Sequence, residues 1–240
     1  MRAAYRFSSR RLRHALLVAT LGYLLMLSFP QVLFAHELSY RTFTVYARQP
    51  LDKEIYAVLD KAEARLAASE IHDEAVRPRI VLTGGFHSYA LWSLYVGGNS
   101  FGKSYPLLPT NNIFINKSEP ARDAVLRRAA AHGERSLSGV IAHETTHLLI
   151  RRKFGYWRNL AMPAWKKEGY AEYVAGGSTL SYDDGVRMWK ASPSDASGYR
   201  YFKYYMLVKY LIDHDRVSAE ELFNRDFDVR FLEQRVLASL

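Results

Sequence analysis

The chain of 240 residues contains no cysteine. Disulfides and thiolate-ligated metals are therefore excluded, and any metal must be held by histidine, aspartate or glutamate. The sequence also lacks internal repeats and low-complexity segments, so we treat it as an ordinary globular chain.

Acidic residues are absent from residues 1–35, whereas five arginines lie within residues 1–14. The apolar run ALLVATLGYLLMLSFPQVLFA follows and ends at Ala35. This pattern is typical of a secretory signal peptide. Leu33, at the third position before a cut after Ala35, is large for a cleavage site, so an uncleaved N-terminal membrane anchor of about 20 residues is the alternative. Both interpretations predict an exported chain, either periplasmic or extracellular, or anchored and facing outside.

Most of the basic excess belongs to this segment. The chain has 33 basic and 24 acidic residues, and 28 basic residues remain without the five N-terminal arginines, which leaves a net charge of +4. So small an excess of positive charge favours solubility but does not indicate nucleic-acid binding. We expect no nucleic-acid partner, and membrane association only through the N-terminal segment.

Residues 36–240 are long enough for a single domain with a sizeable core. Hydrophobic periodicity predicts a sheet-containing part over residues 36–135 and a helical part over residues 136–240. The expected strands are 40–48, 79–84 and 112–118, with a helix at 51–69 and a loop or distorted hairpin at 84–111. A helix is expected to begin after Ser136, which would be its N-cap. The other later helices are expected at 120–132, 163–175, 182–190, 199–213, 219–223 and 228–240. The fold class is therefore α+β, with a small mixed sheet packed on the helix that follows Ser136 and a mostly helical C-terminal half.

The segment HETTH places His143 and His147 four residues apart, one turn apart on one face of a helix. Two imidazoles at this spacing can share one ion, and Glu144 beside them can reach a metal-bound water. The pattern occurs by chance in about one to two per cent of chains of this composition. Apolar neighbours predict a buried helix, in which two imidazoles and a carboxylate without an ion would be costly. A metal site is therefore the favoured interpretation.

A hydrolytic zinc site needs a third protein ligand and an open position. The segment PAWKKEGYAEY, residues 163–173, predicts a second helix with Glu168 and Glu172 on one face. Either glutamate could face the histidine pair. Gly169, without a side chain, would let the two metal-bearing helices approach closely.

Together, HETTH and WKKEGYAEY resemble the gluzincin zinc metallopeptidases, and most of all the short, exported peptidase-MA-like proteins of that group. The resemblance covers residues 138–173. It implies a thermolysin-like catalytic core with one Zn²⁺ per chain, held by His143, His147 and Glu168. Glu144 would be the catalytic base, and Glu172 would orient a ligand histidine.

A weaker likeness extends to YRYFKYYMLVKYLIDHD, because such proteins often follow the zinc helices with a tyrosine-led helix. It implies that Tyr201 stabilises the oxyanion, with Tyr204 and Tyr205 as alternatives, although tyrosines in such a helix can equally be packing residues. Relatives of this kind bind peptide along a sheet edge that faces the zinc, and residues 112–116 are placed in sequence where that edge should be. Asn111 and Asn112 could then contact substrate or simply form a turn.

These patterns predict an exported zinc-dependent hydrolase that cleaves a peptide or protein substrate. The segment Gly-x-Met-Glu-Asn of the aminopeptidase branch is missing, so aminopeptidase activity is not expected. Two alternatives stay open: an inactive pseudo-peptidase that acts as a binding or structural protein of the envelope, and a non-peptide amidase that uses the same site. His87, in the glycine-rich segment, could line the cleft but is more simply an exposed loop residue.

Overall fold

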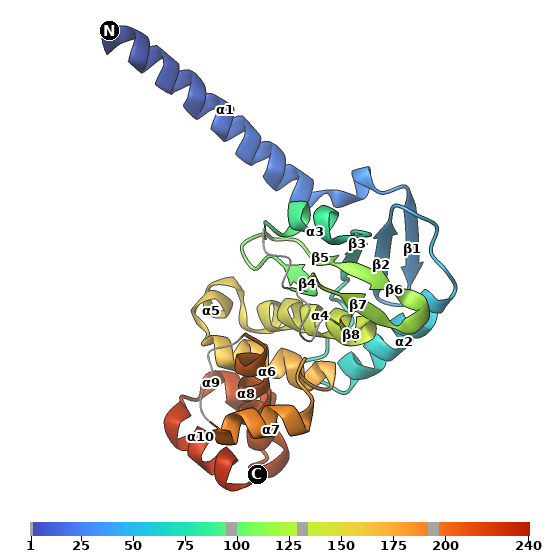
Figure 1. Cartoon of the computed structure of the whole chain (residues 1–240), viewed down its shortest axis with the longest axis vertical. Helices are drawn as coiled ribbons and strands as arrows, with labels where there is room; N and C mark the ends of the chain where they lie inside the picture. The colour runs from blue at the N-terminus through green and yellow to red at the C-terminus, as the bar shows by residue number, and fades with distance from the viewer. Residues whose placement is uncertain (1, 95–99, 129–133, 192–196) are drawn as a thin grey trace.

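The computed structural model of the chain describes residues 2–94, 100–128, 134–191 and 197–240. A small mixed sheet lies in the first half, and the C-terminal half consists of helices (Figure 1). The predicted α+β class is confirmed at this level.

Five strands form the mixed sheet in the order β1-β2-β3-β5-β4. The three central strands β2, β3 and β5 are parallel, whereas β1 and β4 pair antiparallel at the two edges. The strands are β1 (His36–Tyr40), β2 (Phe43–Ala47), β3 (Arg79–Leu82), β4 (Gly102–Ser104) and β5 (Asn112–Ile115). The strand predicted at 40–48 is therefore β2, and β1 before it was not predicted. The chain reverses between them at Arg41, which adopts a φ of 52°.

Helices provide the two parallel crossovers. The helix α2 (Glu54–Ala67), which joins β2 to β3, lies within the predicted range 51–69. The segment 84–111, predicted as a loop or hairpin, contains the helix α3 (Phe86–Ser93) as well as β4. The sequence pattern missed α3 because its residues are apolar on most sides and show no helical stripe.

Alternation along the central strands divides the core between the two faces of the sheet. Ile80 and Ile113 belong to a cluster that also contains α2 and the helix α4 (Leu137–Phe154). Val81 and Phe114 point to the opposite face and belong to a smaller cluster of Leu27, Phe34, Tyr46, Val81, Tyr89, Trp92 and Phe114, which we call the aromatic cluster. The sheet is therefore buried on both faces, as expected for central parallel strands.

The N-terminal segment forms the helix α1 (Arg2–Ser28) and a short 3-10 turn (Pro30–Leu33). Most of α1 projects away from the rest of the molecule (Figure 1). None of the helices in the described parts of the chain is long and apolar enough to cross a membrane. That this segment directs export or anchors the chain stays a prediction.

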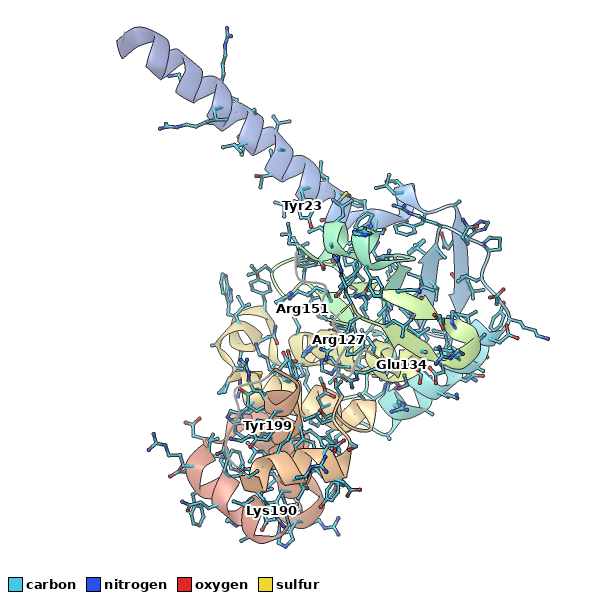
Figure 2. The ribbon with its side chains drawn as sticks, viewed as in Figure 1. Tyr23, Arg127, Glu134, Arg151, Lys190 and Tyr199 are labelled. Carbon is cyan, nitrogen blue, oxygen red and sulfur yellow. The ribbon has the colours of Figure 1, made fainter. Side chains whose placement is uncertain are left out.

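The end of α1 nevertheless packs on the sheet. Leu27 is 2% exposed within the aromatic cluster. The buried amide of Asn112 donates hydrogen bonds to the carbonyl oxygens of Leu27 at 2.7 Å and Ser28 at 3.1 Å. The hydroxyl of Tyr23, at the base of the projecting helix in Figure 2, donates to the carbonyl oxygen of Leu91 at 2.7 Å. The last turns of the N-terminal segment are thus part of the folded body, although the sequence suggested that they lie outside it.

The helix predicted at 120–132 is wrong where the structure describes it. Residues 120–122 form only a 3-10 turn, and a three-stranded antiparallel sheet follows the order β6-β7-β8. Its strands are β6 (Lys117–Glu119), β7 (Ala124–Leu126) and β8 (Glu134–Ser136). Asp123, with a φ of 49°, ends the turn, and its carboxylate accepts from the backbone N–H and the hydroxyl of Ser138. This tertiary contact overrides the helical propensity of the segment. Residues 129–133 of the predicted helix lie outside the described residues.

The C-terminal half contains the predicted helices, with α5 as an unpredicted addition. These are α5 (Tyr156–Ala161), α6 (Ala164–Ala175), α7 (Tyr182–Ala191), α8 (Ser197–Lys209) with a π-helical turn (Tyr210–His214), α9 (Ala219–Asn224) and α10 (Val229–Ala238). The helix α6 packs between α4 and α8. A Cβ atom on Gly169 would lie 2.4 Å from the carbonyl oxygen of Tyr204, so Gly169 permits the approach of α6 to α8. The expectation that it brings the two metal-bearing helices together is therefore wrong.

Candidate metal centre

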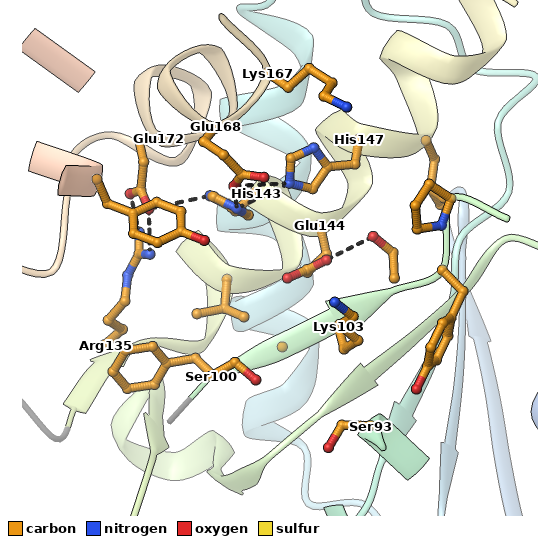
Figure 3. Close-up of a pocket in the computed structure, with 18 of the residues that line it drawn as sticks. Ser93, Ser100, Lys103, Arg135, His143, Glu144, His147, Lys167, Glu168 and Glu172 are labelled. Carbon is orange, nitrogen blue, oxygen red and sulfur yellow. Dashed lines mark hydrogen bonds and ion pairs between the residues drawn. The ribbon is translucent and has the colours of Figure 1, made fainter. Parts of the chain in front are cut away.

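HETTH lies in the middle of α4, which begins directly after the small three-stranded sheet. The hydroxyl of Ser136 accepts a hydrogen bond from the backbone N–H of Gly139 at 3.3 Å, so the predicted N-cap is confirmed. His143 and Glu144 are buried and His147 is partly exposed, all on the part of α4 that borders one cleft. The helix thus presents both imidazoles and the carboxylate to the same space (Figure 3).

Glu168 reaches the histidine pair from α6. Its Oε2 atom lies 3.4 Å from Nε2 of His143 and 3.5 Å from Nε2 of His147, and the two Nε2 atoms are 3.2 Å apart. Three ligand atoms around a tetrahedral ion with bonds of 2.0–2.1 Å are separated by about 3.3 Å. The three side chains could therefore hold a metal ion. A tetrahedral ion with three protein ligands would have a fourth position for water or another ligand.

The electrostatics of this group suit a cation. Burial would lower the pKa of His147, but the carboxylates of Glu168 and Glu144 outweigh burial and raise it. Burial would raise the pKa of Glu168, but the charges and hydrogen bonds of His147 and His143 outweigh burial and lower it well below its usual range. Positive charge is thus strongly stabilised at the point where the three ligand atoms meet.

Glu144 stands beside this group and is held by the edge strand β4. Its Oε2 atom accepts a hydrogen bond of 2.8 Å from the hydroxyl of Ser104. A Cβ atom on Gly102 would lie 2.9 Å from Val140 Cγ1 and 3.0 Å from Glu144 Cγ, so only glycine allows β4 to lie this close to α4. Sequence reasoning missed both residues because they lie in a segment without periodicity. A turn-rich segment gives no sign of a strand that packs on the HETTH helix.

Glu172, one turn after Glu168 on α6, lies on the other side of His143. Its Oε1 atom is 3.5 Å from His143 Nδ1, which is longer than an ordinary hydrogen bond. Arg135 of β8 donates to both oxygens of Glu172, at 2.9 and 2.7 Å, and also to the carbonyl oxygen of Gly177. Glu172 therefore faces the nitrogen of His143 that points away from the ligand group, and Arg135 fixes the carboxylate there. The sequence offered no signal for Arg135.

Tyr201 of α8 lines the same cleft, whereas Tyr204 and Tyr205 are not among its lining residues. Burial, and then the charges of Glu168, Glu144 and Glu172, raise the pKa of the Tyr201 phenol. The phenol therefore stays protonated and can act as a hydrogen-bond donor.

The predicted substrate edge is wrong. The strand β5 lies between β3 and β4, and Asn112 is buried with its amide bound to the end of α1. The Oδ1 atom of Asn111 accepts from Arg151 at 3.1 Å. The edge that lies against the ligand group is β4, which the sequence did not predict. His87 lies on α3 and is not among the residues that line the cleft.

The cleft that contains these groups has a volume of about 430 Å³. It is bordered by β4 on one side and by α4, α6 and the start of α8 on the others. An ion at the ligand group would therefore lie at a surface cleft with the carboxylate of Glu144 and the phenol of Tyr201 beside it. A purely structural ion would instead have a closed coordination sphere.

No family model matches the chain, and no curated protein matches it. The likeness to gluzincins is thus a likeness of the two sequence motifs.

Proposed function

We propose that the chain is a zinc metallopeptidase of the gluzincin type, exported by its N-terminal segment, with a thermolysin-like catalytic core. The observation that carries this proposal is the convergence of two Nε2 atoms and one carboxylate oxygen at 3.2–3.5 Å from one another. Nitrogen and oxygen ligands at tetrahedral spacing, with one position open, are typical of catalytic zinc.

His143, His147 and Glu168 would hold the zinc ion. When bound there, zinc supplies a Lewis acid that polarises a carbonyl and lowers the pKa of water toward about 7. Glu144 then takes a proton from the attacking water and passes it to the leaving amine. Ser104 keeps one oxygen of Glu144 in place through its hydrogen bond. The Tyr201 phenol donates to the oxyanion that develops on the substrate carbonyl.

Glu172 and Arg135 act on the geometry of His143. A carboxylate opposite Nδ1 favours the tautomer with its proton on that nitrogen and leaves Nε2 free to bind a metal. Arg135 balances the charge of Glu172, which is 1% exposed and would be costly to bury alone.

Metal content of the purified full-length chain tests the ligand set. Elemental mass spectrometry should give one zinc per chain in the wild type and little or none in His147→Ala and Glu168→Ala. The matched control is His214→Ala, because His214 is exposed and its neighbour Asp215 keeps its ion pair with Arg235. A folded wild type that takes up no zinc after metal resupply would overturn the proposal. Full zinc with no hydrolysis of peptides would indicate a binding protein, and hydrolysis of amides other than peptides would indicate an amidase.

A further inference from the structure

The cleft around the ligand group carries more positive than negative side chains. Its acidic residues are Glu144, Glu168 and Glu172. Its basic residues are Lys103, Arg127, Arg135, Arg151 and Lys167. A cleft lined by one sign of charge concentrates ligands of the opposite sign. This holds only for the positive charges that the three acids do not already balance.

Each acid has a partner other than the lysines. Glu172 pairs with Arg135 through two hydrogen bonds, and Glu168 faces the two histidines. Glu144 accepts from Ser104. A divalent ion at the ligand group would add positive charge to the cleft. The charges of Lys103, Lys167 and Arg151 are therefore not balanced by these carboxylates.

Arg151 shows this imbalance most clearly. In the described chain its guanidinium donates only to neutral acceptors, which are the carbonyl oxygens of Leu108 and Thr110 and the side chain of Asn111. Burial lowers the pKa of Arg151 and outweighs the opposing effect of Tyr156. These bonds hold Arg151 in place among the residues that line the cleft, so it contributes charge rather than a mobile contact.

The two lysines are better placed to touch a ligand. Lys103 is the exposed residue of β4, between Gly102 and Ser104. Lys167 precedes the ligand Glu168, and its Nζ donates to the carbonyl oxygen of Asn159 at 2.8 Å. Within the described residues the lysines that pair with acids are Lys61, Lys117, Lys203 and Lys209, so neither Lys103 nor Lys167 does. Figure 3 shows them on opposite sides of His147 and Glu144.

We propose that this cleft selects acidic peptides, with Lys103 and Lys167 binding substrate carboxylates on either side of the cleaved bond. The inference rests on the proposed peptidase function and assigns its substrate class. Two lysines that flank the reacting centre match acidic residues before and after the bond, whereas a basic peptide would meet like charge at both ends.

The test uses the full-length, zinc-loaded protein and three peptide sets that share one backbone length. The flanking residues are aspartate and glutamate in the first set, their amides in the second and lysine in the third, each with a neutral fluorophore. We expect kcat/KM and the affinity measured by fluorescence anisotropy to be about tenfold better for the acidic than for the amide set. The preference should weaken as ionic strength rises.

Substitution of the lysines identifies the contacts. Lys103→Gln should remove part of the preference, and the variant with both Lys103→Gln and Lys167→Gln should treat acidic and amide peptides alike. Lys190→Gln, an exposed residue outside the cleft, is the matched control and should keep the full preference. Zinc content of each variant shows whether the metal site is intact.

Anisotropy separates the two proposals. If no peptide is cleaved but the acidic set still binds more tightly and loses part of this advantage in Lys103→Gln, the substrate class stands and the peptidase proposal falls. If peptides are cleaved and bound without regard to charge, or if Lys103→Gln leaves the preference intact, the inference of acidic substrates is overturned.

Discussion

The two faces of the mixed sheet are covered in different ways. On one face α2 and α4 pack against the sheet, and α4 carries the candidate metal ligands close to the edge strand β4. On the other face the aromatic cluster is closed by α3 and by the end of α1, with Phe34 and Trp92 rings 5.6 Å apart. The first face is polar where it meets the cleft, whereas the second is mainly apolar, with Asn112 as a buried polar residue that binds the end of α1. We therefore expect changes at the first face to alter chemistry, and changes at the second to alter stability.

Glu144→Gln, on the face of the sheet that α4 covers, should abolish turnover without loss of the metal. The amide keeps the shape of the side chain but cannot take a proton, so turnover should fall by about a thousandfold or more. Zinc content and the free energy of unfolding should stay near those of the wild type. Peptide hydrolysis with matched zinc analysis checks this, and substantial remaining turnover would mean that another group is the base.

Leu27→Ala, in the aromatic cluster on the other face of the sheet, should lower the stability and leave zinc binding unchanged. Leu27 is 2% exposed, so its truncation leaves a cavity that costs about 2–5 kcal/mol of unfolding free energy. Denaturant unfolding measures this cost, and zinc bound per folded chain should not change. The control is Leu21→Ala on the same helix, because Leu21 is 51% exposed and its loss should cost about 0.5 kcal/mol or less. Equal effects of the two substitutions would show that α1 does not pack on the sheet in solution.

Zinc affinity should depend on pH through the ligand histidines. Metal binding needs neutral imidazole, and the carboxylates that raise the pKa of His147 favour its protonated form instead. Affinity should therefore rise with pH, by about tenfold per pH unit for each imidazole that must lose a proton, and level off above the raised pKa of His147. Titration with buffered zinc from about pH 5 to about pH 8 measures the slope. A flat profile would exclude a histidine ligand.

Ser104→Ala should have the smallest effect of the four. Loss of one hydrogen bond to Glu144 raises the activation free energy by about 1 kcal/mol, which corresponds to an about fivefold lower kcat. KM and zinc content should stay near those of the wild type. Ser104→Thr, which keeps a hydroxyl, should recover part of the loss. A change in stability without a change in kcat would make Ser104 a purely structural residue.

Prediction from sequence succeeded where the relevant contacts are local. His143 and His147 are one turn apart on a single helix, and Glu168 and Glu172 likewise, so periodicity alone places each pair on one face. The predicted Ser136 cap and the helices after residue 163 depend on equally local signals. The strand β1, the helix α3 and the short sheet β6-β7-β8 escaped prediction because their segments are short or lack a clear period.

The α+β class, the two helices of the candidate metal centre and the histidine pair were already determined by the amino-acid sequence, because periodicity and capping act over a few residues. Only the tertiary structure decided that β4 rather than β5 borders the cleft, that Ser104 and Arg135 hold the two glutamates, and that the end of α1 belongs to the folded body. Each of these depends on contacts between residues 37 to 85 positions apart in the chain, which no local pattern encodes.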